Sequence, residues 1–576
     1  MGRIASGKER IDIIYRKQKN NTTYVYRRIS IYDKEHGYYI TKEQKLIGKK
    51  INGTDEIVST RTKLMSNESK EDIKAQKIRI GASAIVEHIG KESGIDADIY
   101  ESCDEAIAKK IITLARYYFQ SDGEATSHIE NWQLTHSLEP YGYPISEDTA
   151  HNLFKMIGSN EAITQTIFLK RAKKLGNNKV LAYDSTTVST YGQNHTRARY
   201  GYNKEADGLE TDKTFTFYSM DTREPICFNT VPGNVPDVLA IDNSTKQLEA
   251  YGLTGAEVVT DCGFYSEKNI SLLFQSSFNF LTRVPIDIKW IRSEIDKVLI
   301  KLEDTGNMSQ NEAGTYGVTT CLTHQFKKDR KYSSKNKGLK AGDTQTFSKR
   351  VYLHIFVNDI NRIKKIRAFD DELNRIRNEY VSGERDFKTA AQKMIDKFMF
   401  IKQKRNGSVE ITFNTKAIRE EKKYYGVFVL IANKEKDTFK ALDKFRKREW
   451  IEDFFEEYKQ RVGNKKYRVW DDLTMDGKKL IQFVALCYYE YFSKKLNELK
   501  SILGVKNGDE KHDLKDNLTK EKALKNWLNN KSIQEIFEWF DAIEKTDVST
   551  PFAKKTWTTE TIDRDKLFFQ KLGIKL

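Results

Sequence analysis

Three carboxylates and two cations are the side chains of this sequence whose types and spacing could do chemistry. Asp184 follows the short apolar run 180–183, and Asp261 ends a second run at 258–259. Acidic side chains are costly inside a sheet, but at its edge they can face a cleft. Two carboxylates on neighbouring strands could share a magnesium ion, which prefers oxygen ligands. An aspartate at a strand end also commonly caps a turn, and for each residue alone that alternative stays open.

The third carboxylate, Glu452, lies in an expected helix over 438–463. At 100° per residue, Arg448, Glu452 and Lys459 fall within an arc of about 60°, together with Phe445. The helix therefore presents one carboxylate flanked by two cations. An ordinary solvated face, or a local ion pair between Arg448 and Glu452, is the alternative. The opposite, apolar side is expected to pack into the core through Trp450, Ile451, Phe454 and Tyr458.

Composition limits the class of protein. A chain of 576 residues is too long for one compact core and predicts two to four domains. The net charge of +16 indicates a polyanionic partner, although a lysine-rich proteome would give the same balance. Five scattered cysteines without a CxxC pair argue against a disulfide framework or a zinc cluster. No long apolar run occurs, so we expect neither a signal peptide nor a membrane span.

The elements that must position these residues follow from changes of pattern along the chain. Three strands, a helix, a strand, a helix and a strand are expected over 179–285, which predicts an α/β sheet with helices on its faces. Residues 286–423 break this rhythm and look inserted, because a strand at 425–431 and a long helix resume after them. The expected regions are a β-rich segment 1–66, a helical DNA-binding or linking region 67–178, a first core part 179–285, an insertion subdomain 286–423, a second core part 424–477 and a helical tail 478–576.

Four motifs in this order resemble a known family. Phe445-x2-Arg448-x3-Glu452-x6-Lys459 resembles the Tyr-x2-Arg-x3-Glu-x6-Lys signature of DDE insertion-sequence transposases. Phe445 departs from the signature tyrosine and lacks its hydroxyl. Segments 182–186 and 260–264 are similar to the family's two aspartate strands, and 232–237 is similar to its Pro-Gly-Asn-x-x-Asp box. The resemblance spans about 180–500.

The resemblance implies a fold and a site. The expected fold is a ribonuclease-H-like mixed sheet with flanking helices, interrupted by a β-containing insertion, in a multidomain α+β protein. Asp184, Asp261 and Glu452 would be catalytic and would hold two Mg²⁺ ions, with Mn²⁺ able to substitute. Arg448 and Lys459 would contact DNA phosphates, Arg448 as a fork and Lys459 as a point charge.

It also implies an activity and partners. The expected function is cut-and-paste transposition, in which the enzyme binds terminal inverted repeats, cleaves both strands and joins them to target DNA. Double-stranded DNA, as element ends and as target, would be the partner of a homodimer in the synaptic complex. No membrane partner is expected, and the expected location is the cytoplasm of a bacterium or archaeon, at the nucleoid.

Two other functions stay open. A ribonuclease-H-fold nuclease or resolvase would share the acids but would cut without strand transfer. A domesticated DNA-binding protein would have lost catalysis, and Phe445 is the one sign of that. Among weaker site candidates, a basic loop with His195, Arg197 and Arg199 could contact DNA. Trp290 could stack on an extruded base, although packing is the favoured interpretation.

Overall fold

The computed structural model describes residues 9–17, 22–33, 36–50, 57–58, 74–176, 179–192, 194–329, 344–404, 409–460, 466–505, 514–549 and 554–576. Its chain forms two compact units, Met1–Gln76 with Thr546–Thr556, and Lys77–Lys545 with Trp557–Leu576. None of the helices in the described ranges combines the length and apolar composition that a bilayer crossing requires.

The first unit contains a four-stranded sheet in the order β1-β2-β3-β4. Its hairpin β2–β3 lies within the segment 1–66 that was expected to be β-rich, and Gly37 takes a left-handed φ of 76° in the turn between the two strands. The boundary expected at 66/67 lies outside the described residues. The strands are β1 (Glu9–Lys17), β2 (Thr23–Asp33), β3 (Tyr38–Lys50) and β4 (Ile57–Val58).

Helices precede the main sheet, as expected for most of 67–178. The exception is β5 (Lys74–Arg79), which belongs to a three-stranded sheet in the order β18-β17-β5. The helices are α1 (Gly81–Glu92), α2 (Ile95–Tyr100), α3 (Glu105–Gln120), α4 (Ile129–Trp132), α5 (Glu147–Ser159) and α6 (Glu161–Lys173), with a short 3-10 turn η2 (Thr126–His128) before α4.

The main sheet follows the order of elements expected for 179–285. Strands β6, β7 and β8 pair antiparallel, and β9 then runs parallel to both β6 and β10. The elements are β6 (Val180–Thr190), β7 (Thr211–Ser219), β8 (Glu224–Pro232), α7 (Asp237–Ala250), β9 (Glu257–Thr260), η3 (Cys262–Phe264), α8 (Glu267–Gln275) and β10 (Asn279–Val284). The predicted mixed α/β sheet is therefore confirmed.

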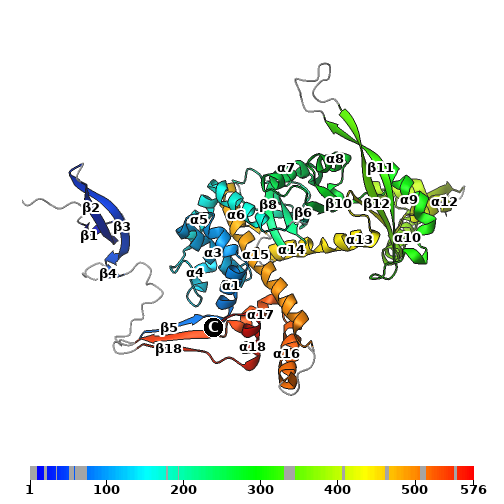
Figure 1. Cartoon of the computed structure of the whole chain (residues 1–576). Helices are drawn as coiled ribbons and strands as arrows, with labels where there is room; N and C mark the ends of the chain where they lie inside the picture. The colour runs from blue at the N-terminus through cyan, green and yellow to red at the C-terminus, as the bar shows by residue number, and fades with distance from the viewer. Residues whose placement is uncertain are drawn as a thin grey trace, which may run out of the picture. The chain divides into compact units, whose positions relative to one another are not determined.

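Alternate side chains of the sheet face two different helix layers. Tyr183 stacks on Phe217, and its hydroxyl lies 2.6 Å from that of Ser244 in α7. Tyr218 packs against Phe454 of α14 (Glu449–Gln460) on the other face. Figure 1 shows α7 and α8 on one side of these strands and α14 on the other. Asp184 follows Tyr183, so it belongs to the α14 face.

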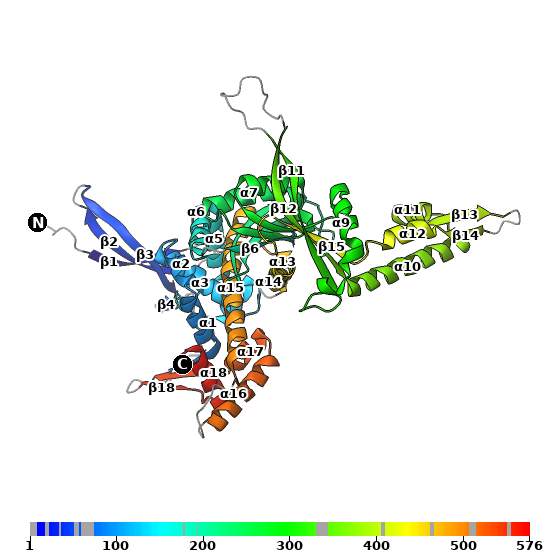
Figure 2. The same ribbon diagram turned by 45° about the vertical axis from the view of Figure 1, so that its right-hand side comes forward.

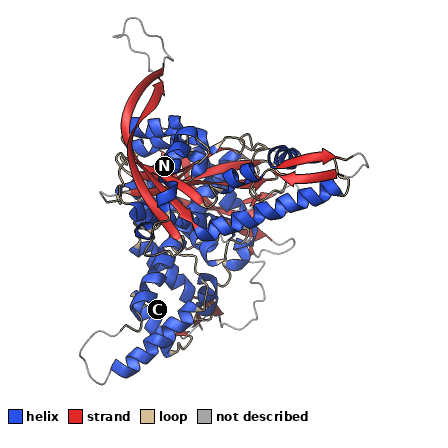
Figure 3. Ribbon diagram, turned by 90° about the vertical axis from the view of Figure 1, so that its right-hand side faces the viewer, coloured by secondary structure: helices blue, strands red, loops and turns tan. Residues whose placement is uncertain are grey.

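The expected separation of 286–423 from the sheet is wrong for its two longest strands. After α9 (Lys289–Leu302) and the 3-10 turn η4 (Thr305–Asn307), β11 (Thr315–Asp329) and β12 (Thr344–Asn358) extend the same sheet, in the order β11-β12-β15-β10. Strand β12 pairs with β15 (Val427–Ala432), which pairs in turn with β10. Residues 351–357 of β12 are buried on both faces, so they need an interior place in a sheet. Figure 3 shows the β11–β12 ribbon continuing from the sheet.

The part of the insertion that follows β12 packs on itself. Leu373, Ile376, Ile395 and Phe398 form a core separate from that of the sheet. Its elements lie together in Figure 2: α10 (Asp359–Val381), α11 (Thr389–Phe398), β13 (Met399–Gln403), β14 (Val409–Phe413) and α12 (Thr415–Lys422).

Two helix predictions after β15 need correction. The helix expected over 438–463 is two helices, α13 (Thr438–Lys447) and α14, which meet at Arg448, and 461–465 lie outside the described residues. The boundary expected at 477/478 falls inside α15 (Asp472–Ile502), which runs unbroken because both of its halves are buried against neighbouring elements. The tail is also not wholly helical. Its elements are α16 (Leu514–Asn529), α17 (Ile533–Phe540), β17 (Glu544–Ser549), β18 (Lys554–Thr558) and α18 (Asp563–Leu572), and β16 (Lys466–Tyr467) precedes α15.

Two lysines of α15 are buried and differ in their surroundings. Lys479 donates to Asp212 at 3.0 Å, so its charge is paired. Burial, with a contribution from Arg468, lowers the pKa of Lys478 to about 8. Between that pH and 10.5 the unfolded chain holds a proton that the folded chain has lost, so the contribution of Lys478 to stability rises with pH.

We expect Lys478→Met to stabilise the protein at pH 7 by about 3 kcal/mol, because it removes a cation that is costly to bury. The difference from the natural protein should shrink between pH 8 and 10.5. Urea unfolding of both proteins at pH 7 and pH 10 measures it. A constant difference across that range would contradict the burial argument.

Phe454 anchors α14 on the sheet and is 2% exposed. Phe454→Ala should cost about 3–5 kcal/mol through the cavity that it leaves. Phe400, which is 57% exposed, offers the matched control, and Phe400→Ala should change stability little. Thermal melting of the two variants measures the effect, and equal melting temperatures would show that α14 is not held by this contact.

Candidate active site

The register of β6 and β9 brings the two aspartates together. Tyr183 lies opposite Thr260, where the parallel pairing ends, so the next residues, Asp184 and Asp261, stand at the same level on adjacent strands. Such strands are about 4.8 Å apart. The sequence suggested that Asp184 lies at the end of its strand. The strand instead continues beyond Asp184, because β7 pairs with β6 as far as Ser189.

Arg448 connects Asp184 to Glu452. Its Nη1 donates to Oδ2 of Asp184 at 3.0 Å, and its Nη2 donates to Oε1 of Glu452. The Arg448 side chain is only 8% exposed, whereas that of Glu452 is 53% exposed. An ordinary solvated face was one alternative interpretation of these cations, and Arg448 does not fit it, because its guanidinium lies against the charged sheet residue Asp184. The local pair with Glu452 that was the alternative interpretation is present.

Burial and charge oppose each other at this bridge. Burial raises the pKa of the Asp184 carboxyl above its ordinary value, and the neighbouring Arg448 works against that rise. Burial alone would lower the pKa of Arg448, but the charges of Asp184 and Glu452 outweigh it and leave that pKa raised. The guanidinium also lies over the Phe445 ring, 5.4 Å from its centroid, a contact that needs no tyrosine hydroxyl.

A cavity of about 620 Å³ opens beside the bridge. Asp184, Asp261 and Glu452 all line it, and so does Lys459, whose Nζ donates to Glu205 at 2.7 Å. Two further cations that the sequence did not single out, Lys204 and Lys213, line it as well. The cavity therefore combines carboxylates with cations, an arrangement that suits a phosphodiester and a hard metal ion.

A second layer of contacts involves Asp237. Its Oδ1 accepts from Lys213 at 2.8 Å and from the Ser185 hydroxyl at 3.1 Å, so it links the residue after Asp184 to α7. Asp237 is the last residue of the Pro-Gly-Asn-x-x-Asp segment, and that motif was the sequence feature that could have pointed to it. The motif spacing did not predict that Asp237 would contact Lys213 and Ser185.

One carboxylate oxygen at this site, Oδ1 of Asp261, is suited to binding a divalent cation. Oδ1 of Asp261 is buried without a hydrogen-bond partner, which is costly unless a ligand satisfies it. Within the described ranges no three His, Cys, Asp or Glu side chains are gathered closely enough to hold one ion. The acids that line the cavity are hard oxygen donors, and Asp261 offers the unsatisfied atom.

The weaker candidates have structural partners. His195 is buried, and its Nε2 lies 2.9 Å from the carbonyl oxygen of Val469, while Arg197 pairs with Asp476 at 2.6 Å. Arg199 is exposed. Trp290 stacks on His324 with ring centroids 4.1 Å apart. These contacts agree with the packing interpretation of Trp290.

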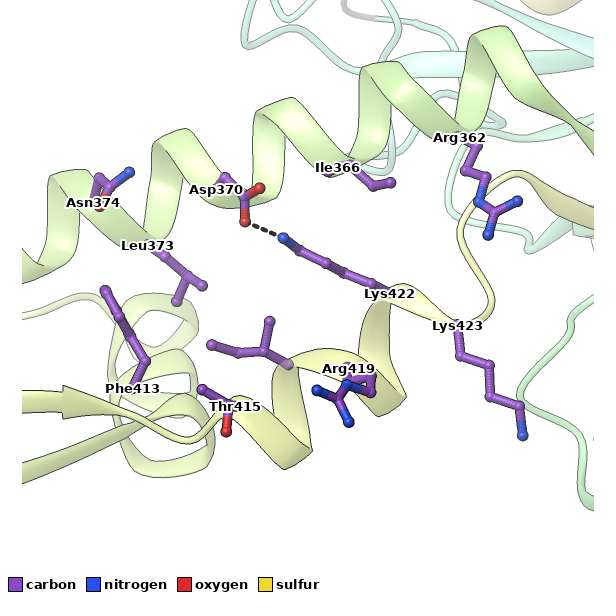
Figure 4. Close-up of a pocket in the computed structure, with 11 residues that line it drawn as sticks. Arg362, Ile366, Asp370, Leu373, Asn374, Phe413, Thr415, Arg419, Lys422 and Lys423 are labelled. Atoms are coloured by element: carbon purple, nitrogen blue, oxygen red, sulfur yellow. Dashed lines mark ion pairs between the residues drawn. The ribbon is translucent and has the colours of Figure 1, made fainter.

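A second cavity, of about 690 Å³, lies between α10 and α12. Figure 4 shows Lys422 reaching across it to Asp370. Asp370 is the one carboxylate among its lining residues, so the cavity lacks the oxygen ligands that the smaller one has. Its cations are Arg362, Arg419, Lys422 and Lys423.

Arg448→Ala should lower stability by about 3–5 kcal/mol, because it leaves the Asp184 carboxyl buried without its counter-charge. Lys459→Ala should cost less than about 1 kcal/mol, since its partner Glu205 is 39% exposed. Thermal melting of both variants tests this. The double variant Arg448→Ala/Asp184→Asn removes both charges and should recover part of the loss, and absence of any recovery would contradict the pairing.

The chain matches a known protein family over the region that contains this site. The family model described as "Transposase DDE domain" matches residues 176–559. No curated protein matches the chain. A solved structure, the cryo-EM structure of a piggyBac transposase synaptic complex with hairpin DNA, aligns with a TM-score of 0.34 and 10% identity, covering 81% of this chain and 87% of that chain. The family match covers more than half of the sequence and includes all three acids, so the protein belongs to the transposase DDE domain family.

Proposed function

We propose that this protein is a cut-and-paste transposase that binds the terminal inverted repeats of its element, cleaves both strands and joins them to target DNA. The observation that carries the proposal is the register of β6 and β9, which sets Asp184 and Asp261 side by side in the cavity that Glu452 also lines. These three residues are proposed as the catalytic acids. The host would be a bacterial or archaeal cell, with the enzyme at the nucleoid.

The proposed catalytic core is ribonuclease-H-like. Its support is the succession of three antiparallel strands, β6 to β8, followed by two strands, β9 and β10, that lie parallel to β6 and are reached through α7 and α8. The acids come from the middle of this sheet and from α14, which packs on one face through Ile451 and Phe454.

Asp184, Asp261 and Glu452 would hold two Mg²⁺ ions, for which Mn²⁺ could substitute. When bound, the ions would supply an activated oxygen nucleophile and stabilise the departing oxygen. Until then Arg448 bridges Asp184 and Glu452, and its charge opposes the rise that burial causes in the pKa of the Asp184 carboxyl. The buried oxygen of Asp261 is available to a ligand without breaking an existing hydrogen bond.

The cations of the cavity would position DNA. Lys204 and Lys459 both line it, and their charges can attract phosphates without selecting a base. Arg448 would exchange a carboxylate contact for a phosphate oxygen of the substrate. Two element ends must be joined in one event, so the active form is proposed to be a homodimer on DNA.

Asp184→Asn, Asp261→Asn and Glu452→Gln should each abolish cleavage while leaving DNA binding, because each removes one negative oxygen ligand and keeps the side chain's shape. Glu449→Gln is the matched control, since Glu449 lies in α14 but does not line the cavity. The assay uses purified protein, linear DNA carrying the sequences that border the gene, Mg²⁺ and a target plasmid, and it should fail when the metal is chelated.

The products distinguish the proposed function from its alternatives. Joined products support transposition. Nicked or cut DNA without joining would indicate a nuclease, and binding without either would indicate a non-catalytic DNA-binding protein. Full activity in any one acid variant would remove that residue from the catalytic set.

A further inference from the structure

Tyr202 lies at the rim of the catalytic cavity with its ring in solvent. It is one of the residues that line this cavity, together with Asp184 and Lys204, and it is 76% exposed. Within the described part of the chain, the Tyr202 ring takes part in no hydrogen bond, ring stacking or cation–π contact. A large aromatic ring held in water beside a polar cavity has apolar area that a ligand could cover.

The backbone on the C-terminal side of Tyr202 is held in place by polar contacts. The side-chain amide of Asn203 donates to the Ser189 hydroxyl at 3.2 Å, and the ammonium group of Lys204 donates to the Ser185 carbonyl at 3.2 Å. Glu205 accepts from Lys459 of α14 at 2.7 Å. The three residues that follow Tyr202 are thus tied to β6 and α14, the elements that carry Asp184 and Glu452. The backbone from which the Tyr202 ring projects is thus held at a fixed place relative to the acids.

The other aromatic residues that line this cavity are buried. Phe264 is 1% exposed and Phe455 is 6% exposed. Among the described residues that line the cavity, Tyr202 is therefore the aromatic whose ring is free for a ligand.

The chemistry around Tyr202 selects the ligand class. Lys204, Lys213 and Lys459 give the cavity cations that attract a phosphodiester chain, and every nucleobase has a flat face that stacks on an exposed aromatic ring. Resting on the proposed function, we propose that Tyr202 stacks on an unpaired base of the DNA strand whose phosphate enters the cavity. Tyr202 would then be a positioning residue, since it holds the nucleotide beside the scissile bond without touching the reacting atoms.

The test separates base contacts from phosphate contacts. The probes are a fluorescein-labelled dT 12-mer and a 12-mer of the same length and charge whose nucleotides are all abasic. The natural protein should bind the dT 12-mer roughly tenfold more tightly than the abasic one. Tyr202→Ala should lose roughly that factor on the dT 12-mer only, and Tyr202→Trp should restore it.

Tyr143→Ala is the control, because Tyr143 is also exposed, at 58%, but does not line the cavity, and it should leave both affinities unchanged. Melting temperatures should match throughout, since neither ring is buried. Equal binding of the two probes, or unchanged dT binding by Tyr202→Ala, overturns the stacking proposal even where the natural protein cuts and joins plasmid DNA. A natural protein that neither cuts DNA nor binds either probe overturns the proposed function as well.

Discussion

The ion bridge from Asp184 through Arg448 to Glu452 is the interaction on which the arrangement of the site depends. It joins the centre of the sheet to the first turn of α14, two parts of the chain more than 260 residues apart. A buried carboxylate is unfavourable on its own, and a lone buried guanidinium is equally so. Each charge offsets the cost of burying the other, and the contact holds the start of α14 beside Asp184 of β6. The apolar contacts of Ile451 and Phe454 then secure the helix below that point.

The sequence was sufficient for the order of the core elements. Asp184 and Asp261 were singled out because each follows an apolar run, and those runs are adjacent parallel strands. The catalytic role of the two residues stays a prediction. The apolar side of the helix was also predicted correctly, since Ile451, Phe454 and Tyr458 are buried. What helical periodicity could not supply was the burial of Arg448, because its position depends on Asp184, a residue of another element. Periodicity equally gave no signal for the interruption between α13 and α14.

The insertion shows a second limit of prediction from sequence. The apolar pattern of residues 351–357 predicts a strand, but it does not predict which strand they pair with. Pairing between β12 and β15 joins segments some 75 residues apart, and such long-range pairing is set by the whole sheet rather than by local sequence. By contrast, the small core around Leu373 and Phe398 consists of residues close in sequence, and this part alone packs separately, as the interruption of pattern suggested.

The neighbouring positions of β12 and β15 have a consequence for how this chain could change in length. Val357, near the end of β12, pairs with Val427 at the start of β15, so the chain leaves the sheet and returns to it at nearly the same place. The ends of the intervening segment are held by the strand pair itself. Closure of a longer loop adds only about 0.6 kcal/mol for each doubling of its length. Residues could be gained or lost beyond the sheet, around α10 to α12, at little cost to the strands that carry the acids. This makes that region a natural place for relatives to diverge in size.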